Sequence, residues 1–116
     1  MDDTGTTGTT PTLQAALTVG NLSLDIIAQK MTVGGTHVHM TMRQFQMMEL
    51  LARKPDTVIT KEGFLDHLYA GVDEPEHNII DVYICKIRKT LAGAGSTVRI
   101  ETVWGRGYKL VVPDTP

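Results

Sequence analysis

The sequence lacks the features that indicate a secreted, membrane-spanning or enzymatic protein. It has one cysteine, Cys85, so no internal disulfide can form, which suits a reducing cytoplasm. No apolar run reaches the roughly 18–20 residues that a membrane span needs, and the acidic start MDD does not resemble a signal peptide. Gly-rich phosphate loops, nucleophile elbows and paired-carboxylate motifs are missing as well. We therefore expect a cytoplasmic protein that is not an enzyme and needs no cofactor.

Positive charge is absent from one long segment and concentrated in the next. The net charge of the 116 residues is −2. Residues 62–81 contain six acids and no Lys or Arg, whereas residues 82–112 contain six bases and one acid. A division this sharp predicts one surface that binds an anion and another that avoids it.

The first part of the chain divides into a tail and a small sheet. Residues 1–12 are rich in Thr and Gly and predict a disordered tail, because they offer little apolar surface to bury. Residues 13–116 then form one domain. Short β-type runs occupy 17–39, and Gly34-Gly35 between two of them is a hairpin signal. They predict an antiparallel sheet of three or four strands.

Two helices should follow this sheet. Thr41 with Gln44 three residues later is a capping box, and this helix should run to about Lys54 and be mostly buried. Thr60 is a second start signal for a helix to about Ala70.

Two glycines and one proline bear on where these helices begin and end and on how stable they are. Gly71 should stop the second helix, and Pro75 should lie at or near the start of a third. Gly63 costs up to about 1 kcal/mol inside a helix, which predicts a weak first turn in the second one.

The run NIIDVYICKIRKTL, residues 78–91, predicts a third helix with two distinct faces. Helical spacing places Ile80, Ile84, Ile87 and Leu91 within about 40° of one another, as a core stripe. The opposite face mixes an amide, apolar side chains and cations, and consists of Asn78, Val82, Cys85 and Lys89, with Lys86 beside them. Asn and Lys can bond base edges in a DNA major groove, and an exposed Val can contact a thymine methyl. The alternative is an ordinary amphipathic helix whose cations only keep it soluble.

Two strands, residues 97–103 and 107–113, should enclose the turn Trp104-Gly105-Arg106-Gly107. A tight turn of this kind projects Arg106 at its tip, where it is shaped for a narrow A/T-rich minor groove. A solvated turn residue is the alternative. The predicted fold class is α+β, with the order sheet, three helices, hairpin.

In this order, the motifs MTMRQF, VITKEGFLDHLY, IIDVYICKIRKTL and IETVWGRGYKL resemble a known family. Over about residues 17–112 the chain is similar to the winged helix-turn-helix effector domain of OmpR/PhoB-type response regulators. Within that family it looks closest to the CtrA cell-cycle regulators of alphaproteobacteria, which share DEPE, IDVYICKIRK and ETVWGRGY. The resemblance implies an N-terminal antiparallel sheet, three helices and a C-terminal β-hairpin wing.

The resemblance also implies roles for particular residues, with residues 77–91 as the recognition helix lying in the major groove. Asn78, Val82, Cys85, Lys86 and Lys89 stand where the family contacts bases and nearby phosphates, and Arg88 stands at a phosphate-contacting position. Arg106 would be the wing arginine in the minor groove, and Thr60 and Lys61 would hold the DNA backbone. In loop 71–76, Asp73, Glu74 and Glu76 would face the sigma subunit of RNA polymerase, with simple solubility as the alternative.

The chain departs from the family pattern in three ways, the first of which is the unusual Gly63 within the second helix. Family members often carry Arg at the positions of Cys85 or Asn78, so phosphate affinity should be modest here. The family's N-terminal receiver domain, of roughly 120 residues, does not precede the sheet. Met1 and the tail favour a stand-alone effector, which aspartyl phosphorylation would not switch, over a fragment of a longer regulator.

We therefore expect a sequence-specific transcription regulator that binds double-stranded DNA. It should be a monomer in solution and pair head-to-tail on direct repeats about one helical turn apart. Sites shared with a full-length CtrA-type regulator are a further hypothesis. A winged-helix module for protein–protein contact is the alternative function. His37 and His39 share one strand face, but no Cys or carboxylate cluster accompanies them, so we expect no metal site.

Overall fold

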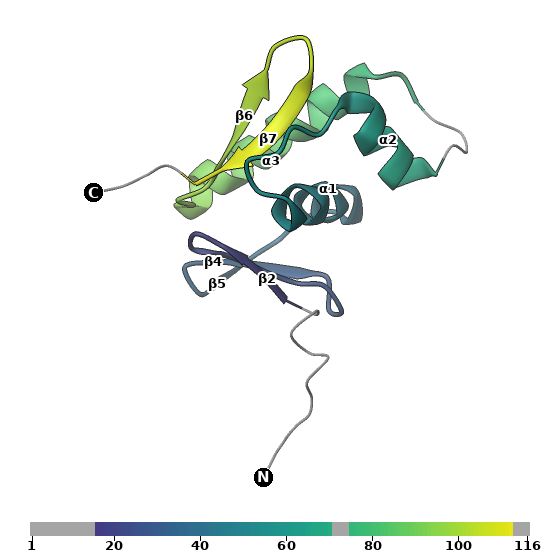
Figure 1. Cartoon of the computed structure of the whole chain (residues 1–116). Helices are drawn as coiled ribbons and strands as arrows, with labels where there is room; N and C mark the ends of the chain where they lie inside the picture. The colour runs from purple at the N-terminus through teal and green to yellow at the C-terminus, as the bar shows by residue number, and fades with distance from the viewer. Residues whose placement is uncertain (1–15, 71–74, 113–116) are drawn as a thin grey trace.

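The structure is a computed structural model that describes residues 16–70 and 75–112 (Figure 1). Strands β2 (Ala16–Val19), β3 (Leu22–Asp25), β4 (Lys30–Val33) and β5 (Thr36–Val38) come first. Helices α1 (Met42–Arg53), α2 (Lys61–Tyr69) and α3 (Asn78–Ala94) follow, and strands β6 (Arg99–Val103) and β7 (Gly107–Val111) form the hairpin. This order confirms the predicted winged-helix class. The tail at 1–12 lies outside the described residues, so the predicted domain boundary stays a prediction.

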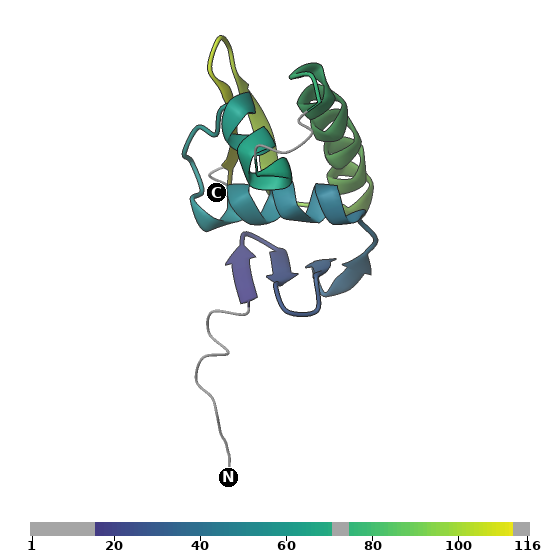
Figure 2. The ribbon, with the colours of Figure 1, turned by 90° about the vertical axis from the view of Figure 1, so that its right-hand side faces the viewer.

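The N-terminal strands form one antiparallel sheet in the order β2-β3-β4-β5. Its turn at Gly34-Gly35 has positive φ at both residues, 59° and 86°, as the predicted hairpin requires. Alternate side chains, among them Leu22, Leu24, Met31 and Val33, are buried on one face. Figure 2 shows the sheet beneath α1, with α2, α3 and the hairpin on the other side of that helix.

Helix α1 is the central layer of the molecule. Thr41 Oγ1 accepts the backbone N–H of Gln44, and the Gln44 side chain accepts the backbone N–H of Thr41, which confirms the capping box. Five apolar side chains of the helix are buried: Phe45, Met47, Met48, Leu51 and Ala52. A helix buried toward both neighbouring layers carries apolar residues around most of its circumference.

Helix α2 begins and ends close to the predicted residues. Thr60 caps it by accepting the N–H of Gly63 at 2.9 Å, and Phe64, Leu65 and Leu68 face the core. The predicted stop at Gly71 lies outside the described residues. Ala70 already takes the left-handed cap conformation, with φ at 52°.

Helix α3 is longer than the sequence analysis predicted. It ends at Ala94 instead of Leu91, because Gly95, with φ at 76°, supplies the left-handed cap that closes a helix. Gly93 is accommodated in the last turn. Pro75 lies three positions before the first helical residue, Asn78, so it is not part of the helix.

A polar junction ties the N-terminal sheet to the loop after α3. The Asn21 side chain donates to the carbonyl of Gly95 at 3.1 Å and accepts the backbone N–H of Thr97 at 2.9 Å. The hydroxyl of Thr97 in turn accepts the backbone N–H of Asn21 at 3.1 Å. These bonds hold the base of the hairpin against the sheet.

The hairpin is also joined to the segment between α1 and α2. Tyr108 and Ile59 exchange two backbone hydrogen bonds, of 2.7 and 3.0 Å. The two backbone segments are so close at Gly107 that a Cβ there would lie 2.1 Å from the Ile59 carbonyl oxygen. Glycine is therefore required at this position.

Gly107→Ala should lower the free energy of unfolding by about 2–3 kcal/mol, since the backbone must move to admit the methyl group. Urea unfolding followed by circular dichroism measures the effect. Gly93→Ala is the matched control: its Cβ meets nothing within 4 Å, and a helical Ala stabilises by up to about 1 kcal/mol. Equal losses in the two variants would contradict the close approach.

Candidate nucleic-acid interface

The predicted base-contacting side chains lie on the exposed strip of α3. Asn78, Cys85, Lys86 and Lys89 are all exposed. Val82 is 45% exposed, so an apolar side chain stands on this strip without joining the core. The core stripe, formed by Ile80, Ile84, Ile87 and Leu91, is buried as predicted.

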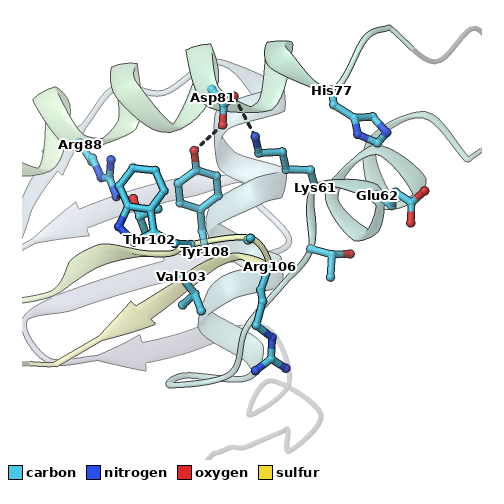
Figure 3. A pocket seen from close by; sticks show the side chains of 13 residues that line it. Lys61, Glu62, His77, Asp81, Arg88, Thr102, Val103, Arg106 and Tyr108 are labelled. Atoms are coloured by element: carbon cyan, nitrogen blue, oxygen red, sulfur yellow. Dashed lines mark hydrogen bonds and ion pairs between the residues drawn. The ribbon is translucent and has the colours of Figure 1, made fainter.

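A hollow of about 780 Å³ lies between α3, the start of α2 and the hairpin. Four of the predicted site residues line it: Thr60, Lys61, Arg88 and Arg106. The hollow brings together residues from three parts of the chain (Figure 3). It is the feature that combines the second helix, the third helix and the wing into one surface.

The exposed strip of α3 adjoins this hollow. Asp81 and Arg88 on α3 face into the hollow. Because each residue turns an α-helix by about 100°, Cys85 lies about 40° round from Asp81, and Lys89 about 40° further. Figures 1 and 2 both show the hairpin turn and the first part of α3 at the end of the molecule away from the N-terminal sheet. The tip of the wing and the first part of α3 therefore lie at the same end of the molecule, and Cys85 lies beside the side of α3 that lines the hollow.

A carboxylate links the three walls of the hollow. One oxygen of Asp81 accepts the Lys61 ammonium at 3.0 Å, and the other accepts the Tyr108 hydroxyl. Figure 3 shows both bonds converging on Asp81 from α2 and from β7. A single side chain of α3 thus contacts both of its neighbours.

These contacts keep the charges of the cluster stable at neutral pH. The hydrogen bond from Tyr108 lowers the pKa of the Asp81 carboxyl, and the hydrogen bond and charge of Lys61 lower it further, against the opposing effect of burial. Burial, reinforced by the bond to Asp81, raises the pKa of Tyr108 to about 12. Asp81 is therefore an anion and Tyr108 a neutral donor.

Arg88 is engaged within the protein. Its Nε and Nη2 donate to the carbonyl of Ile100 at 3.1 and 2.8 Å, and Nη2 also donates to Thr102 Oγ1 at 2.8 Å. The guanidinium lies 5.5 Å from the centre of the Tyr108 ring. Arg88 thus braces the hairpin against α3, and its contact with phosphate stays a prediction.

The hairpin turn exposes two large side chains. The Arg106 N–H donates to the Val103 carbonyl at 3.0 Å, which closes the turn around Gly105, where φ is 74°. Arg106 is exposed, as predicted for a residue at the tip. Trp104 beside it is 88% exposed.

Sequence reasoning missed several residues of the hollow, among them Asp81, Trp104 and Tyr108. Asp81 was counted only as a member of the acidic segment. One signal was present, since Asp81 and Arg88 are seven residues apart and so share one side of a helix. The partners from α2 and β7 could not be found this way, because they come from distant parts of the chain.

The structure describes one of the three acids that are predicted to contact the polymerase. Glu76 is exposed just before α3, whereas Asp73 and Glu74 lie outside the described residues. In the described ranges, no three His, Cys, Asp or Glu side chains are grouped to hold a metal ion. No helix there has the length and apolar character to cross a membrane.

Comparisons with known proteins agree with this geometry. Residues 35–110 match the family described as transcriptional regulatory protein, C terminal. The chain is 53% identical over 102 residues to the cell cycle response regulator CtrA of Brucella anthropi, and the match covers 87% of this chain and 44% of that protein. The chain therefore spans less than half the length of the curated relatives it matches.

Solved structures share the fold. The DNA-binding domain of Klebsiella pneumoniae RstA, in complex with the RstA box, superposes with a TM-score of 0.73 at 25% identity, over 84% of this chain and 98% of that one. The DNA-binding domain of the response regulator AdeR, in complex with an intercistronic region, superposes with a TM-score of 0.74 at 20% identity. This match covers 83% of this chain and 98% of that one. The family match and the identity to CtrA proteins confirm the resemblance found in the sequence motifs: the chain belongs to the transcriptional regulatory protein C-terminal family, the winged-helix DNA-binding domains of OmpR/PhoB-type response regulators.

Proposed function

We propose that this domain binds double-stranded DNA in a sequence-specific manner and regulates transcription. The single observation that supports this most strongly is the hollow that brings Lys61, Arg88 and Arg106 together, beside a helix that carries an exposed polar and apolar strip. A strip that combines Asn78, Val82 and Lys89 suits the base edges and thymine methyls of a major groove. Arg106 at the hairpin tip suits the adjacent minor groove, particularly where A/T-rich sequence narrows it.

The remaining site residues serve the DNA backbone in this proposal. Cys85 and Lys86 lie near the groove edge, and Thr60 and Lys61 approach a phosphate from the start of α2, where the helix N-terminus favours an anion. Arg88 acts mainly by holding the hairpin at its distance from α3.

We also propose how the domain acts on promoters. It binds as a monomer in solution and pairs head-to-tail on direct repeats about one helical turn apart, in the cytoplasm. Its sites overlap those of a full-length CtrA-type regulator, given the 53% identity to a CtrA protein. Asp73, Glu74 and Glu76 face the sigma subunit of RNA polymerase.

A winged-helix module for protein–protein contact is the second candidate. Trp104 at the hairpin turn and Val82 on α3 are exposed apolar side chains, and such side chains also anchor protein interfaces. This candidate predicts weak DNA binding that salt hardly affects, whereas phosphate contacts make binding strongly salt-dependent.

Selection of bound duplexes from a random pool, repeated at two salt concentrations, tests the proposed function. An enriched repeated motif with a steep salt dependence supports it. A pool without enrichment favours the protein-contact candidate instead. Footprints of this protein and a CtrA regulator on the same promoters then test the shared sites, and separate footprints would contradict them.

Arg106→Ala should weaken binding mainly at sites whose minor groove beside the α3 contacts is A/T-rich, because the arginine loses the strong negative potential there. Titrations of matched duplexes with A/T-rich or G/C-rich flanks, followed by fluorescence anisotropy, measure the difference. A loss of the same size on both flanks would show that Arg106 is not a minor-groove contact.

Lys89→Ala should lower affinity and reduce the dependence of log K on log salt by about one counterion, if the ammonium contacts only phosphate. The slope is measured from titrations at several salt concentrations. Lys30→Ala is the matched control, because Lys30 is an exposed cation on β4, in the sheet at the opposite end of the molecule. The same change of slope in both variants would argue against a contact by Lys89.

A further inference from the structure

Two carboxylates, Asp81 and Glu62, line a hollow that otherwise suits a polyanion, and Asp81 is the one that pairs with Lys61. Asp81 lines the same hollow as Lys61, Arg88 and Arg106, and its side chain is 42% exposed. A phosphate that enters the hollow meets this negative charge, and like charges at short range repel. The charge of the carboxylate therefore opposes phosphate binding in the hollow, so its presence needs a physical reason.

We propose that Asp81 is a specificity-determining residue of this surface. It weakens binding to unmatched DNA by repelling phosphate and by holding the Lys61 ammonium, and it supports binding to a matched site by fixing α2, α3 and the wing together. This inference rests on the DNA binding proposed above and names a residue that opposes binding to the wrong sequences.

The ion pair between Lys61 and Asp81 competes with DNA phosphates for the Lys61 ammonium. Lys61 Nζ and Asp81 Oδ2 are 3.0 Å apart in the lining of the hollow, and the two side chains are 39% and 42% exposed. Exposed ion pairs contribute little to stability, so a phosphate can displace the carboxylate, but only at the expense of the pair. Any duplex whose phosphate contacts Lys61 must therefore displace the Asp81 carboxylate.

The two oxygens of Asp81 also hold two neighbouring elements. One accepts Lys61 of α2 and the other accepts Tyr108 of β7. Binding to unmatched DNA depends on charge alone, whereas a matched site needs α3 and the wing to reach base edges and groove at the same time. Loss of the carboxylate should therefore strengthen binding to unmatched DNA without strengthening binding to a matched site.

Three variants separate these effects. Asp81→Asn removes the charge and the ion pair but keeps an oxygen that accepts the Tyr108 hydroxyl. Glu62→Gln is the matched control: Glu62 lines the same hollow, is exposed, and forms no ion pair within the described ranges. Tyr108→Phe removes the hydroxyl and leaves every charge in place.

The experiment measures affinities by fluorescence anisotropy for a duplex with the selected site and for a scrambled duplex of the same length. Asp81→Asn should bind the scrambled duplex roughly threefold to tenfold more tightly, and the ratio of matched to scrambled affinity should fall by a similar factor. Glu62→Gln should give a smaller increase in affinity for the scrambled duplex. Tyr108→Phe should lower only the matched affinity. In a Lys61→Met background, the effect of Asp81→Asn should shrink to that of Glu62→Gln.

Several results would overturn the inference. Equal gains in affinity for the scrambled duplex in Asp81→Asn and Glu62→Gln would do so, as would an unchanged ratio of matched to scrambled affinity in Asp81→Asn. An Asp81→Asn effect that stays the same in the Lys61→Met background would also contradict it. So would a Tyr108→Phe variant that binds both duplexes more weakly by the same factor. Absence of salt-sensitive DNA binding by the wild type would overturn the proposed function itself. That outcome is read from the wild type alone and is thus distinguished from the others.

Discussion

The geometry of the candidate interface depends on how one residue, Tyr108, attaches the wing to the helices. Its backbone bonds to Ile59 between α1 and α2, at 2.7 and 3.0 Å. Its ring packs 6.4 Å from that of Phe64 of α2 and lies beside the Arg88 guanidinium, and its hydroxyl donates to Asp81 of α3. A two-stranded hairpin is only marginally stable alone. These contacts hold this hairpin in one position relative to α3.

The distribution of charge has a different meaning in the structure than in the sequence. The acidic segment and the basic segment are consecutive in the chain, but the last acid of the first, Asp81, lies among the cations of the second. The exposed strip of α3 carries only two lysines beside an amide, a valine and a cysteine. On a protein with a net charge of −2, such a surface favours recognition by fit and hydrogen bonding over simple attraction to phosphate.

The layers below the interface act as its foundation. Helix α1 is buried between the sheet and the other helices, and Asn21 links the sheet to the base of the hairpin through bonds between residues 74 and 76 positions apart. Buried packing and these long-range bonds resist relative motion of the layers. The face formed by α3 and the wing is therefore held by the whole domain, although its own contacts are few.

Local patterns in the sequence determined the elements of this protein. The capping box at Thr41, the cap at Thr60 and the spacing of Ile80, Ile84 and Ile87 are short-range signals, because caps and helical faces depend on neighbours within a few residues. Ordered motifs likewise identified the family. The end of α3 was predicted three residues early, since a glycine within the last turn and a glycine cap are hard to tell apart.

Only the tertiary structure decided what the site side chains contact. Arg88 was expected to face phosphate, yet its guanidinium bonds Ile100 and Thr102 of the hairpin. The hollow, and the place of Asp81 between Lys61 and Tyr108, arise where three segments far apart in the chain meet. A periodicity reports which face of a helix is turned outward, but it carries no information about which distant residue lies opposite.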